Sequence, residues 1–174
     1  MKIIACLGNP GDKYRQNRHN IGFLLGEHIC EHAGVPLNRK GFSAVYGTGR
    51  MQSHDVLFLF PQTFMNLSGQ AVASVLSFYK EDTTSLIVIH DEIELPFGDI
   101  RKKNGGGHKG HNGLRSIIQC TGSPEFQRLR FGVGRPEKGD VADYVLSDFS
   151  KAERGSFPEL FERARVELEG MIVG

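Results

Sequence analysis

The apolar positions of this chain follow two patterns, short continuous or alternating runs and repeats three or four residues apart. Short runs bounded by turn-forming residues indicate strands, and they occupy residues 2–7, 45–49, 55–60, 86–89 and 129–134. Apolar residues at helical spacing predict helices, and these cover residues 20–33, 66–79 and 113–120, followed by a charged terminal helix over 150–173. Strands and helices therefore alternate along most of the chain.

This alternation predicts one α/β domain over residues 1–174, with a twisted mixed sheet covered by helices on both faces. The run 86–89 is expected to be a central strand, since it is apolar without interruption. The runs 45–49 and 55–60 are expected to form a hairpin around a polar turn. With 174 residues, the chain is long enough to bury a core without metal or disulfide support.

Composition narrows the class of protein. The chain is 39% hydrophobic and 24% charged, which is typical of a globular protein. No apolar run approaches the ~20 residues of a membrane helix, and the apolar stretch at residues 1–7 is too short for a signal peptide. The three cysteines are odd in number and lie in apolar stretches, which predicts reduced packing residues at Cys6, Cys30 and Cys120. We therefore expect a cytoplasmic monomer without an obligate protein partner or membrane contact.

Charge is segregated along the chain, although the net charge is only +1. Residues 101–135 hold eight Lys or Arg and one acid, Glu125, whereas residues 81–99 hold six acids and no Lys or Arg. Residues 137–169 hold nine acids against five Lys or Arg. A basic stripe on a nearly neutral protein predicts local contact with a polyanion, such as the end of a nucleic acid. A solvated loop face is the alternative.

Four loops rich in Asn, His or Gly lie where a predicted strand gives way to a helix. They are Leu7-Gly8-Asn9-Pro10-Gly11, Arg18-His19-Asn20, Thr63-Phe64-Met65-Asn66 and the run from Gly105 to Gly113. Because each Asn side chain offers both donors and an acceptor, carboxamides gathered there suit a peptide backbone. Asn66 is predicted at the N-cap of its helix, and His19 is the one evident proton carrier beside the carboxamides. These loops favour a hydrolytic site for a peptide-like substrate.

Two phosphate-binding motifs are matched only in part. The run from Gly105 to Gly110 has the glycine spacing of a dinucleotide site, but it follows Arg101-Lys102-Lys103, a predicted cationic loop, instead of a first strand. We expect a flexible loop whose backbone N–H groups face phosphate or carbonyl oxygens. Residues 86–92 resemble a magnesium-binding strand, yet the chain has no Gly-x-x-x-x-Gly-Lys-Ser/Thr loop, so an NTPase is disfavoured.

Three further patterns bear on whether the protein uses a metal or a nucleophilic serine. His28-Ile29-Cys30-Glu31-His32 matches an inverted zinc-protease signature. Both histidines share a helical face with apolar residues, which favours partly buried histidines without metal. A metal held by the segment from His90 to Glu94 is disfavoured, because successive side chains of an extended chain point to opposite faces. One functional acid, Asp91, with solvated neighbours is expected instead. Neither Ser68 nor Ser116 carries a nucleophile signature.

Attack by water, with His19 as general base, is the hydrolytic chemistry that remains. A carboxylate such as Asp91 on the second ring nitrogen would fix the tautomer and stabilise the imidazolium that forms. A capping or packing role for His19 stays open on the residues alone.

Taken together, seven segments carry a resemblance that extends over residues 3–149. They are Leu7-Gly8-Asn9-Pro10-Gly11 with Tyr14, Arg18-His19-Asn20-x-Gly22-Phe23, Thr63-Phe64-Met65-Asn66-x-Ser68-Gly69, His90-Asp91-Glu92, Gly110-His111-Asn112-Gly113, Arg128-Leu129-Arg130 and Tyr144-Val145-Leu146. In this combination the chain resembles the bacterial peptidyl-tRNA hydrolase family. The resemblance implies hydrolysis of the ester between a peptide and the 3′-ribose of tRNA, without a metal or cofactor.

The resemblance also implies a role for individual residues. His19 would activate water and pair with Asp91, and the peptide and ester carbonyl would lie against Asn9, Met65, Asn66 and Asn112. Tyr14 would contact the 3′-terminal adenosine or its ester. The acceptor-stem phosphate would lie against Lys103, Arg130 and Lys138. Asn9 is grouped with the catalytic pair, and the partner implied is peptidyl-tRNA.

Two positions depart from the family pattern. Asn17 replaces the usual Thr, and Phe60 replaces a common Lys, which would leave more of the phosphate binding to Lys103 and Arg130. A noncatalytic RNA-binding protein is the rival from another class, since the same scaffold resembles a plant organellar splicing partner. A metal-dependent peptidase built on His28 and His32 is the third class.

Overall fold

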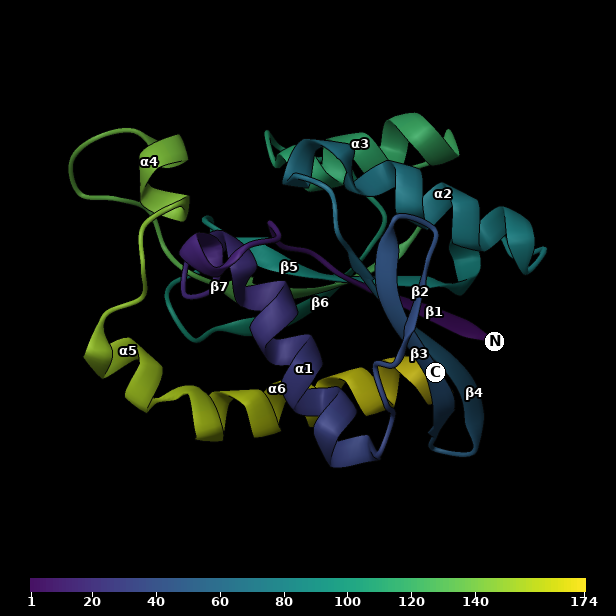
Figure 1. Ribbon diagram of the computed structural model, residues 1–174. Coiled ribbons are helices and arrows are strands. Elements are labelled where there is room, and N and C mark those ends of the chain that lie inside the picture. The colour runs from purple at the N-terminus through teal and green to yellow at the C-terminus, as the bar shows by residue number, and fades with distance from the viewer.

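A seven-stranded mixed sheet forms the centre of the protein, seen in a computed structural model that describes residues 1–174 (Figure 1). In spatial order the strands are β2 (Arg39–Gly41), β3 (Ala44–Met51), β4 (His54–Pro61), β1 (Lys2–Cys6), β5 (Leu86–Glu92), β7 (Gln127–Gly132) and β6 (Ile100–Asn104). The four strands β4, β1, β5 and β7 run parallel. The edge strand β6 pairs antiparallel with β7, and on the other side β3 pairs antiparallel with β4 and the edge strand β2 pairs antiparallel with β3.

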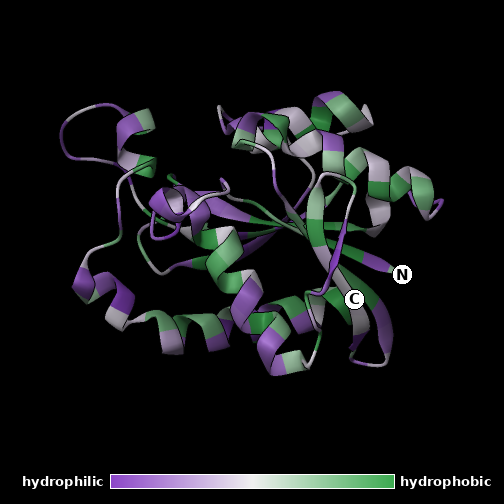
Figure 2. Cartoon of the chain, viewed as in Figure 1, coloured by the Kyte–Doolittle hydropathy of each residue, from purple (hydrophilic) through white to green (hydrophobic).

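Helices cover both faces of this sheet (Figure 1). On one face lie α1 (Ile21–Ala33) and α6 (Phe157–Val173), and on the other lie α2 (Ser68–Phe78) and α3 (Asn112–Thr121). Each face has its own core, and Figure 2 shows apolar residues concentrated on the central strands between the helical layers. The predicted α/β architecture with a covered mixed sheet is confirmed. No helix is long and apolar enough to cross a membrane.

Shorter elements complete the chain. They are the helices α4 (Val141–Val145) and α5 (Lys151–Gly155) and the 3-10 helices η1 (Asp12–Tyr14), η2 (Arg18–Asn20), η3 (Met65–Leu67) and η4 (Thr83–Ser85). In Figure 1, α4 stands apart from the other helices, on the side of the sheet where β5 and β7 lie.

The uninterrupted apolar character of β5 reflects burial on both faces. Ile87 and Ile89 point into the core under α1 and α6, and Leu86 and Val88 point into the core under α2 and α3. All four are fully buried. Since a strand alternates its side chains between faces, only a strand covered on both sides needs apolar residues at every position. This rigid strand carries Asp91 near its carboxyl end.

Several predicted boundaries were wrong. The hairpin turn between β3 and β4 is only Gln52 and Ser53, both at positive φ, so the strands are longer than predicted. The cationic stretch predicted to be a loop is the edge strand β6. A solvent-facing edge strand lacks the apolar alternation that reveals strands, and lysine is typical of such edges.

Other local predictions were also wrong. The terminal helix is broken into α5 and α6 around Ser156, where Pro158 opens the second helix. Asn66 is not an N-cap, because it lies inside η3 and α2 begins at Ser68. Cys6 and Cys30 are buried as expected, but Cys120 is exposed on α3.

Candidate active site

Loops that follow parallel strands meet at one edge of the sheet. Asn9 follows β1, Met65 and Asn66 follow β4, and Asp91 lies near the end of β5. Since parallel strands share one direction, their carboxyl ends meet at the same edge, where open α/β sheets bind ligands. There η2 supplies His19, and the start of α3 supplies Asn112. All of these residues except Asp91 line a cleft of about 480 Å³, and Asp91 is bonded to His19 in its wall.

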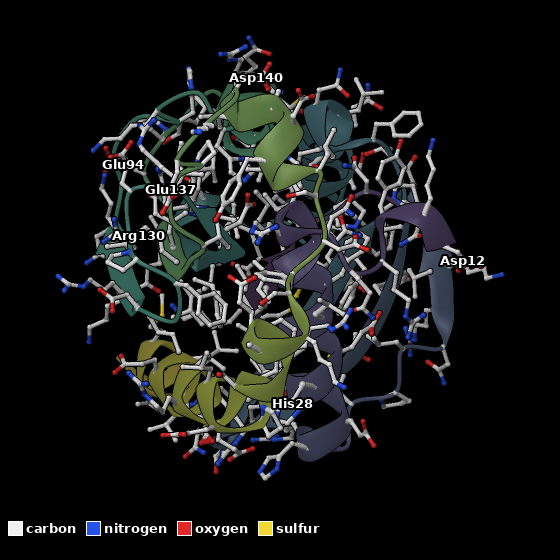
Figure 3. The ribbon with its side chains drawn as sticks, turned by 90° about the vertical axis from the view of Figure 1, so that its left-hand side faces the viewer. Asp12, His28, Glu94, Arg130, Glu137 and Asp140 are labelled. Carbon is white, nitrogen blue, oxygen red and sulfur yellow. The ribbon has the colours of Figure 1, made fainter.

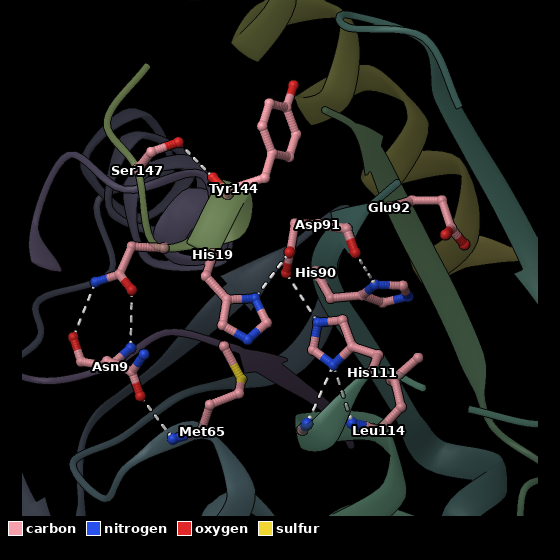
Figure 4. Close-up of polar contacts among 12 residues, drawn as sticks. Asn9, His19, Met65, His90, Asp91, Glu92, His111, Leu114, Tyr144 and Ser147 are labelled. Atoms are coloured by element: carbon pink, nitrogen blue, oxygen red, sulfur yellow. Dashed lines mark hydrogen bonds and ion pairs between the residues drawn. The ribbon is translucent and has the colours of Figure 1, made fainter. Parts of the chain in front are cut away.

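His19 and Asp91 form a buried hydrogen-bonded pair (Figure 4). His19 Nδ1 lies 2.8 Å from Asp91 Oδ2. Burial alone would lower the pKa of His19, but the charge of Asp91 and this hydrogen bond outweigh it and raise the pKa. Burial would raise the pKa of Asp91, but the charge of His19 and the hydrogen bonds to its carboxylate hold that pKa well below its ordinary value. Asp91 is therefore an ionised acceptor, Nδ1 carries the proton, and His19 Nε2 has no partner in the chain.

His111 is a second imidazole on Asp91, and the sequence reasoning missed it. Its Nε2 lies 2.8 Å from Asp91 Oδ1. Its Nδ1 accepts from the backbone N–H groups of Gly113 and Leu114 at 3.1 and 3.3 Å, as the N-cap of α3. An acceptor at Nδ1 requires the proton at Nε2, so His111 is a neutral donor that occupies the second oxygen of Asp91. Its position next to Asn112 in the segment Gly110-His111-Asn112-Gly113 could have indicated that it belongs to the site.

His90 is buried, which contradicts the prediction that the neighbours of Asp91 are solvated. Its side chain is 1% exposed, and its Nδ1 lies 2.7 Å from the carbonyl oxygen of Asp91. Burial, reinforced by His111, lowers the pKa of His90 to about 3. His90 is thus a neutral packing residue behind the pair and carries no proton at neutral pH.

The histidines His19 and His111 and the carboxylate of Asp91 lie close enough to share a metal ion, with ligand atoms within 4.8 Å of one another. The atoms that could bind a metal also take part in hydrogen bonds. Both carboxylate oxygens accept imidazole N–H groups, and the second nitrogen of His111 accepts from the backbone. In this arrangement both imidazoles donate to Asp91, which is how a carboxylate orients an imidazole ring.

Asn9 offers the cleft a donor whose orientation is fixed. Its Oδ1 accepts from the backbone N–H of Met65 at 2.7 Å, which leaves the Nδ2 amide group to donate to a substrate oxygen. Asn20, to which the sequence assigned no role, holds this loop in place. The Asn20 side chain accepts from the backbone N of Asn9 at 2.9 Å and donates to its carbonyl at 2.8 Å.

The remaining predicted cleft residues differ in burial. Met65 is buried in the cleft wall, whereas Asn66 and Asn112 are exposed, and their side chains make no hydrogen bond within the chain. Tyr14 lies at the rim, where its ring meets Phe64 edge-on at 6.4 Å between centroids. Phe64 is 58% exposed and lines the cleft. The structure thus brings all of the predicted peptide-side residues to one cleft, with Tyr14 at its entrance.

The predicted phosphate-binding residues Lys103 and Arg130 share one face of the sheet. In the antiparallel pairing of β6 and β7, Lys103 lies opposite Arg128, and Arg101 lies opposite Arg130. Directly paired residues project to the same side, so four cations gather there. Lys138 is separate, exposed on the loop before α4. Figure 3 shows Arg130 on the same side of the molecule as Glu137, the neighbour of Lys138.

The alternative motifs have structural roles. Ser68 Oγ donates to the carbonyl of Met65, and Ser116 Oγ accepts from the backbone N of Gly69, both at 2.8 Å. His28 Nε2 lies 3.1 Å from Glu162 Oε1, and His32 is exposed, so the predicted burial holds for His28 only in part and fails for His32. The glycine-rich run follows β6, far along the chain from the first strand.

The fold and the site define a class of protein, a hydrolase with a mixed-sheet α/β fold and a His–Asp pair beside carboxamide donors. Comparison with known proteins gives the family. A sequence profile described as peptidyl-tRNA hydrolase matches residues 3–173. The chain therefore belongs to the peptidyl-tRNA hydrolase family.

Individual relatives agree over nearly the whole chain. A peptidyl-tRNA hydrolase of Geobacter metallireducens is 49% identical, covering 99% of this chain and 88% of that protein. One of Brevibacillus brevis is 47% identical over 91% of this chain and 85% of the relative. A crystal structure of peptidyl-tRNA hydrolase from Acinetobacter baumannii has a TM-score of 0.93 at 37% identity, covering 100% of this chain and 89% of that one.

Proposed function

We propose that this protein hydrolyses the ester between the C-terminus of a peptide and the 3′-ribose of tRNA, with water activated by His19. One observation carries the proposal. His19 Nδ1 is bound to Asp91, which leaves Nε2 without a partner in the chain, on the wall of the carboxamide cleft. A positioned general base of this kind contributes roughly 10²–10⁴-fold to the rate. Asp91 orients the ring and stabilises the imidazolium formed when His19 takes the proton.

The carboxamides would bind the acyl part of the substrate. Asn9 Nδ2 is positioned to donate to the carbonyl oxygen as it gains charge, and one such donor is worth roughly 10²–10³-fold. Asn66 and Asn112, free of partners, would read the peptide backbone and not its side chains, so peptides of any sequence are substrates. Lys103, Arg130 and Lys138 would bind phosphate of the acceptor stem, and Tyr14, at the entrance of the cleft, would contact the ester.

We also propose that the protein works in the cytoplasm as a monomer, without a cofactor or an obligate protein partner. The buried thiols of Cys6 and Cys30 are unpaired, as in a reducing compartment.

The deciding experiment measures release of N-acetylaminoacyl groups from tRNA by the native protein and by His19→Ala, in the presence of EDTA. Unblocked aminoacyl-tRNA is the control substrate. Turnover of the N-acylated ester alone, lost in the variant and unaffected by EDTA, is the expected result. Salt-sensitive tRNA binding without turnover would move the protein to the noncatalytic RNA-binding class. Loss of turnover in EDTA would favour metal chemistry.

Discrimination against unblocked aminoacyl-tRNA is predicted to depend on Asn66. An unblocked aminoacyl group lacks the acyl carbonyl, so an Asn66 amide N–H that donates to that carbonyl would be left unpaired, and an unmade hydrogen bond discriminates strongly. Asn66→Ala should therefore lose rate on N-acetylaminoacyl-tRNA or lose its preference for that substrate. The exposed Gln70→Ala on α2 is the control. Unchanged kinetics of Asn66→Ala on both substrates would remove Asn66 from recognition.

A further inference from the structure

A second cavity adjoins the cleft on the far side of the catalytic pair. Its volume is about 390 Å³, and it is bounded by the end of β5, the loop from His108 to Gly110, the start of α3, and α4. His19 and Asn112 line both this cavity and the cleft. If the ester lies at these two shared residues, the two parts that it joins extend in opposite directions. The peptide occupies the carboxamide cleft, and the ribose occupies the second cavity.

Lys109, at the mouth of this cavity, has an unusual backbone conformation. The N–H of His111 donates to the carbonyl of His108 at 3.0 Å, which closes a turn with Lys109 and Gly110 at its centre. Their φ angles are 47° and 84°. A turn with two positive φ angles favours Gly, Asn or Asp at both central positions. Lysine is costly there, and strained residues of this kind cluster at ligand sites.

The buried guanidinium of Arg128 bonds to the backbone of the loop that carries Lys109. Arg128 Nη1 donates to the carbonyl of Gly107 at 2.8 Å, and Nη2 donates to the carbonyls of Gly106 and Pro124. His108 Nδ1 also accepts from the backbone N of Gly110 at 2.9 Å. These bonds support the backbone of the turn, which places Lys109 on the lining of the cavity.

The charges around Lys109 favour an anion. Burial lowers the pKa of the neighbouring Lys103, and the charges of Lys109, Arg128 and Arg130 lower it further, so each of these three cations lies within electrostatic reach of Lys103. The one carboxylate of this cavity beyond Asp91 is Glu92, which lies 3.8 Å from Arg130 and is partly neutralised by it. The local excess of positive charge is a site for phosphate.

We propose that Lys109 binds the phosphate on the 5′ side of the terminal ribose while that ribose lies in the second cavity. This inference rests on the proposed function. The phosphate in question is separated from the ester by a single sugar, so a cation at the mouth of the ribose cavity is at the right place to meet it. Lys103 and Arg130 then continue the basic surface toward the acceptor stem, and Lys109 links the stem contacts to the reacting ester.

The test compares three substrates that share one N-acetylaminoacyl ester. The ester is carried by adenosine, by the dinucleotide cytidylyl-adenosine, or by intact tRNA, and only the last two have the phosphate in question. Lys109→Asn removes the charge and keeps the backbone conformation, because Asn tolerates positive φ. Lys109→Arg keeps the charge. Lys80→Asn is the matched control, since Lys80 is also an exposed lysine at positive φ, 55°, and lines neither cavity.

Lys109→Asn should raise KM for the dinucleotide and tRNA esters and leave the adenosine ester unchanged, whereas Lys109→Arg and Lys80→Asn should resemble the native protein. Loss of one phosphate contact on a single strand lowers the salt slope by about 0.7. For the tRNA ester, the ratio of variant to native KM should therefore shrink by about 2.6-fold between about 50 and 200 mM salt.

Two results would overturn the assignment. Native-like KM values of Lys109→Asn for the dinucleotide and tRNA esters would remove Lys109 from phosphate binding. An equal defect on the adenosine ester would mean that Lys109 acts through the shape of the loop. If the native protein hydrolyses none of the three esters, the proposed function fails and this inference fails with it. If the native protein is active and only the Lys109 result is contrary, this inference fails alone.

Discussion

At the scale of single residues, the charge of Asp91 and its hydrogen bond raise the proton affinity of His19 against the effect of burial. His19 must be unprotonated to accept a proton from water, and its pKa is raised from 6.5. We expect kcat/KM to fall as pH drops through this raised pKa. Asp91→Asn removes the charge that opposes burial, so the acid limb should move to lower pH and the rate should fall by about 10² or more. The pH profile of both proteins is the measurement. An unmoved acid limb would contradict the pairing.

From the lowered pKa of His90 we predict that the stability of the protein, and not its activity, depends on the protonation of this residue. Its pKa is about 3 when folded, against 6.5 when exposed. Between these values the unfolded chain binds a proton that the folded protein refuses, so stability present above pH 6.5 is lost as pH falls toward 3, by about 1.4 kcal/mol per pH unit. His90→Asn keeps a donor for the carbonyl of Asp91 and should flatten this slope in urea titrations. The exposed His32→Asn should leave the slope unchanged, and a native slope in His90→Asn would refute the assignment.

Site residues were predictable from the sequence to different degrees. Asn9 and Asp91 stand at or just after strand ends, where topology alone brings side chains together, and His19 lies just before α1. The contact of His111 with Asp91 spans 20 positions and depends on how α3 is capped, which no local pattern encodes. The burial of His90 depends on side chains packed around it from other elements. Its polar neighbours in sequence instead suggested that it is exposed to solvent.

At the scale of elements, Arg18 ties the segment that carries His19 to the chain that follows α4. Arg18 Nη1 donates to Ser147 Oγ and the Asp148 carbonyl at 2.7 Å each, and Nη2 donates to Glu153 at 2.9 Å. The guanidinium also lies 4.4 Å from the ring centroid of Tyr144. Since α4 lines both cavities, this contact positions one wall of the site relative to the base.

Arg18→Lys tests this connection, because a single ammonium cannot bond all of these acceptors or stack as a planar group does. We expect a loss of about 2–3 kcal/mol in unfolding free energy and a higher KM for N-acetylaminoacyl-tRNA. Arg15→Lys, an exposed arginine on the same segment, is the matched control for chemical denaturation and kinetics. Equal behaviour of the two variants would show that the contact does not organise the site.

Elements were predicted well where the sequence has a strong period. The apolar run of β5 and the helical spacing of α1 and α2 gave the right element types because burial imposes those periods. α4 and β6 were missed because five-residue elements with exposed faces bury too few side chains to leave a pattern. The break before α6 depends on the turn at Ser156, which amphipathic spacing does not reveal.

At the scale of the whole molecule, the cations of β6 and β7 form the surface proposed for the acceptor stem. Lys103→Ala should raise KM for peptidyl-tRNA most at low salt and lower the salt slope by about 0.9, the share of one duplex phosphate. Lys102→Ala is the control, because Lys102 is exposed on the opposite face of the same strand. KM measured across a salt series distinguishes them, and an identical loss in both would mean that net charge matters and the face does not.

The basic residues at the margins of the sheet have an effect unrelated to catalysis. β6 presents Arg101, Lys102 and Lys103, and β2, at the other margin, presents Arg39 and Lys40. A sheet margin carries unpaired N–H and C=O groups that can accept a strand from another molecule, and repulsion between like charges prevents that addition. On β6 these cations include Lys103, which is proposed to bind RNA, so we expect neutralisation of this edge to lower solubility together with substrate binding.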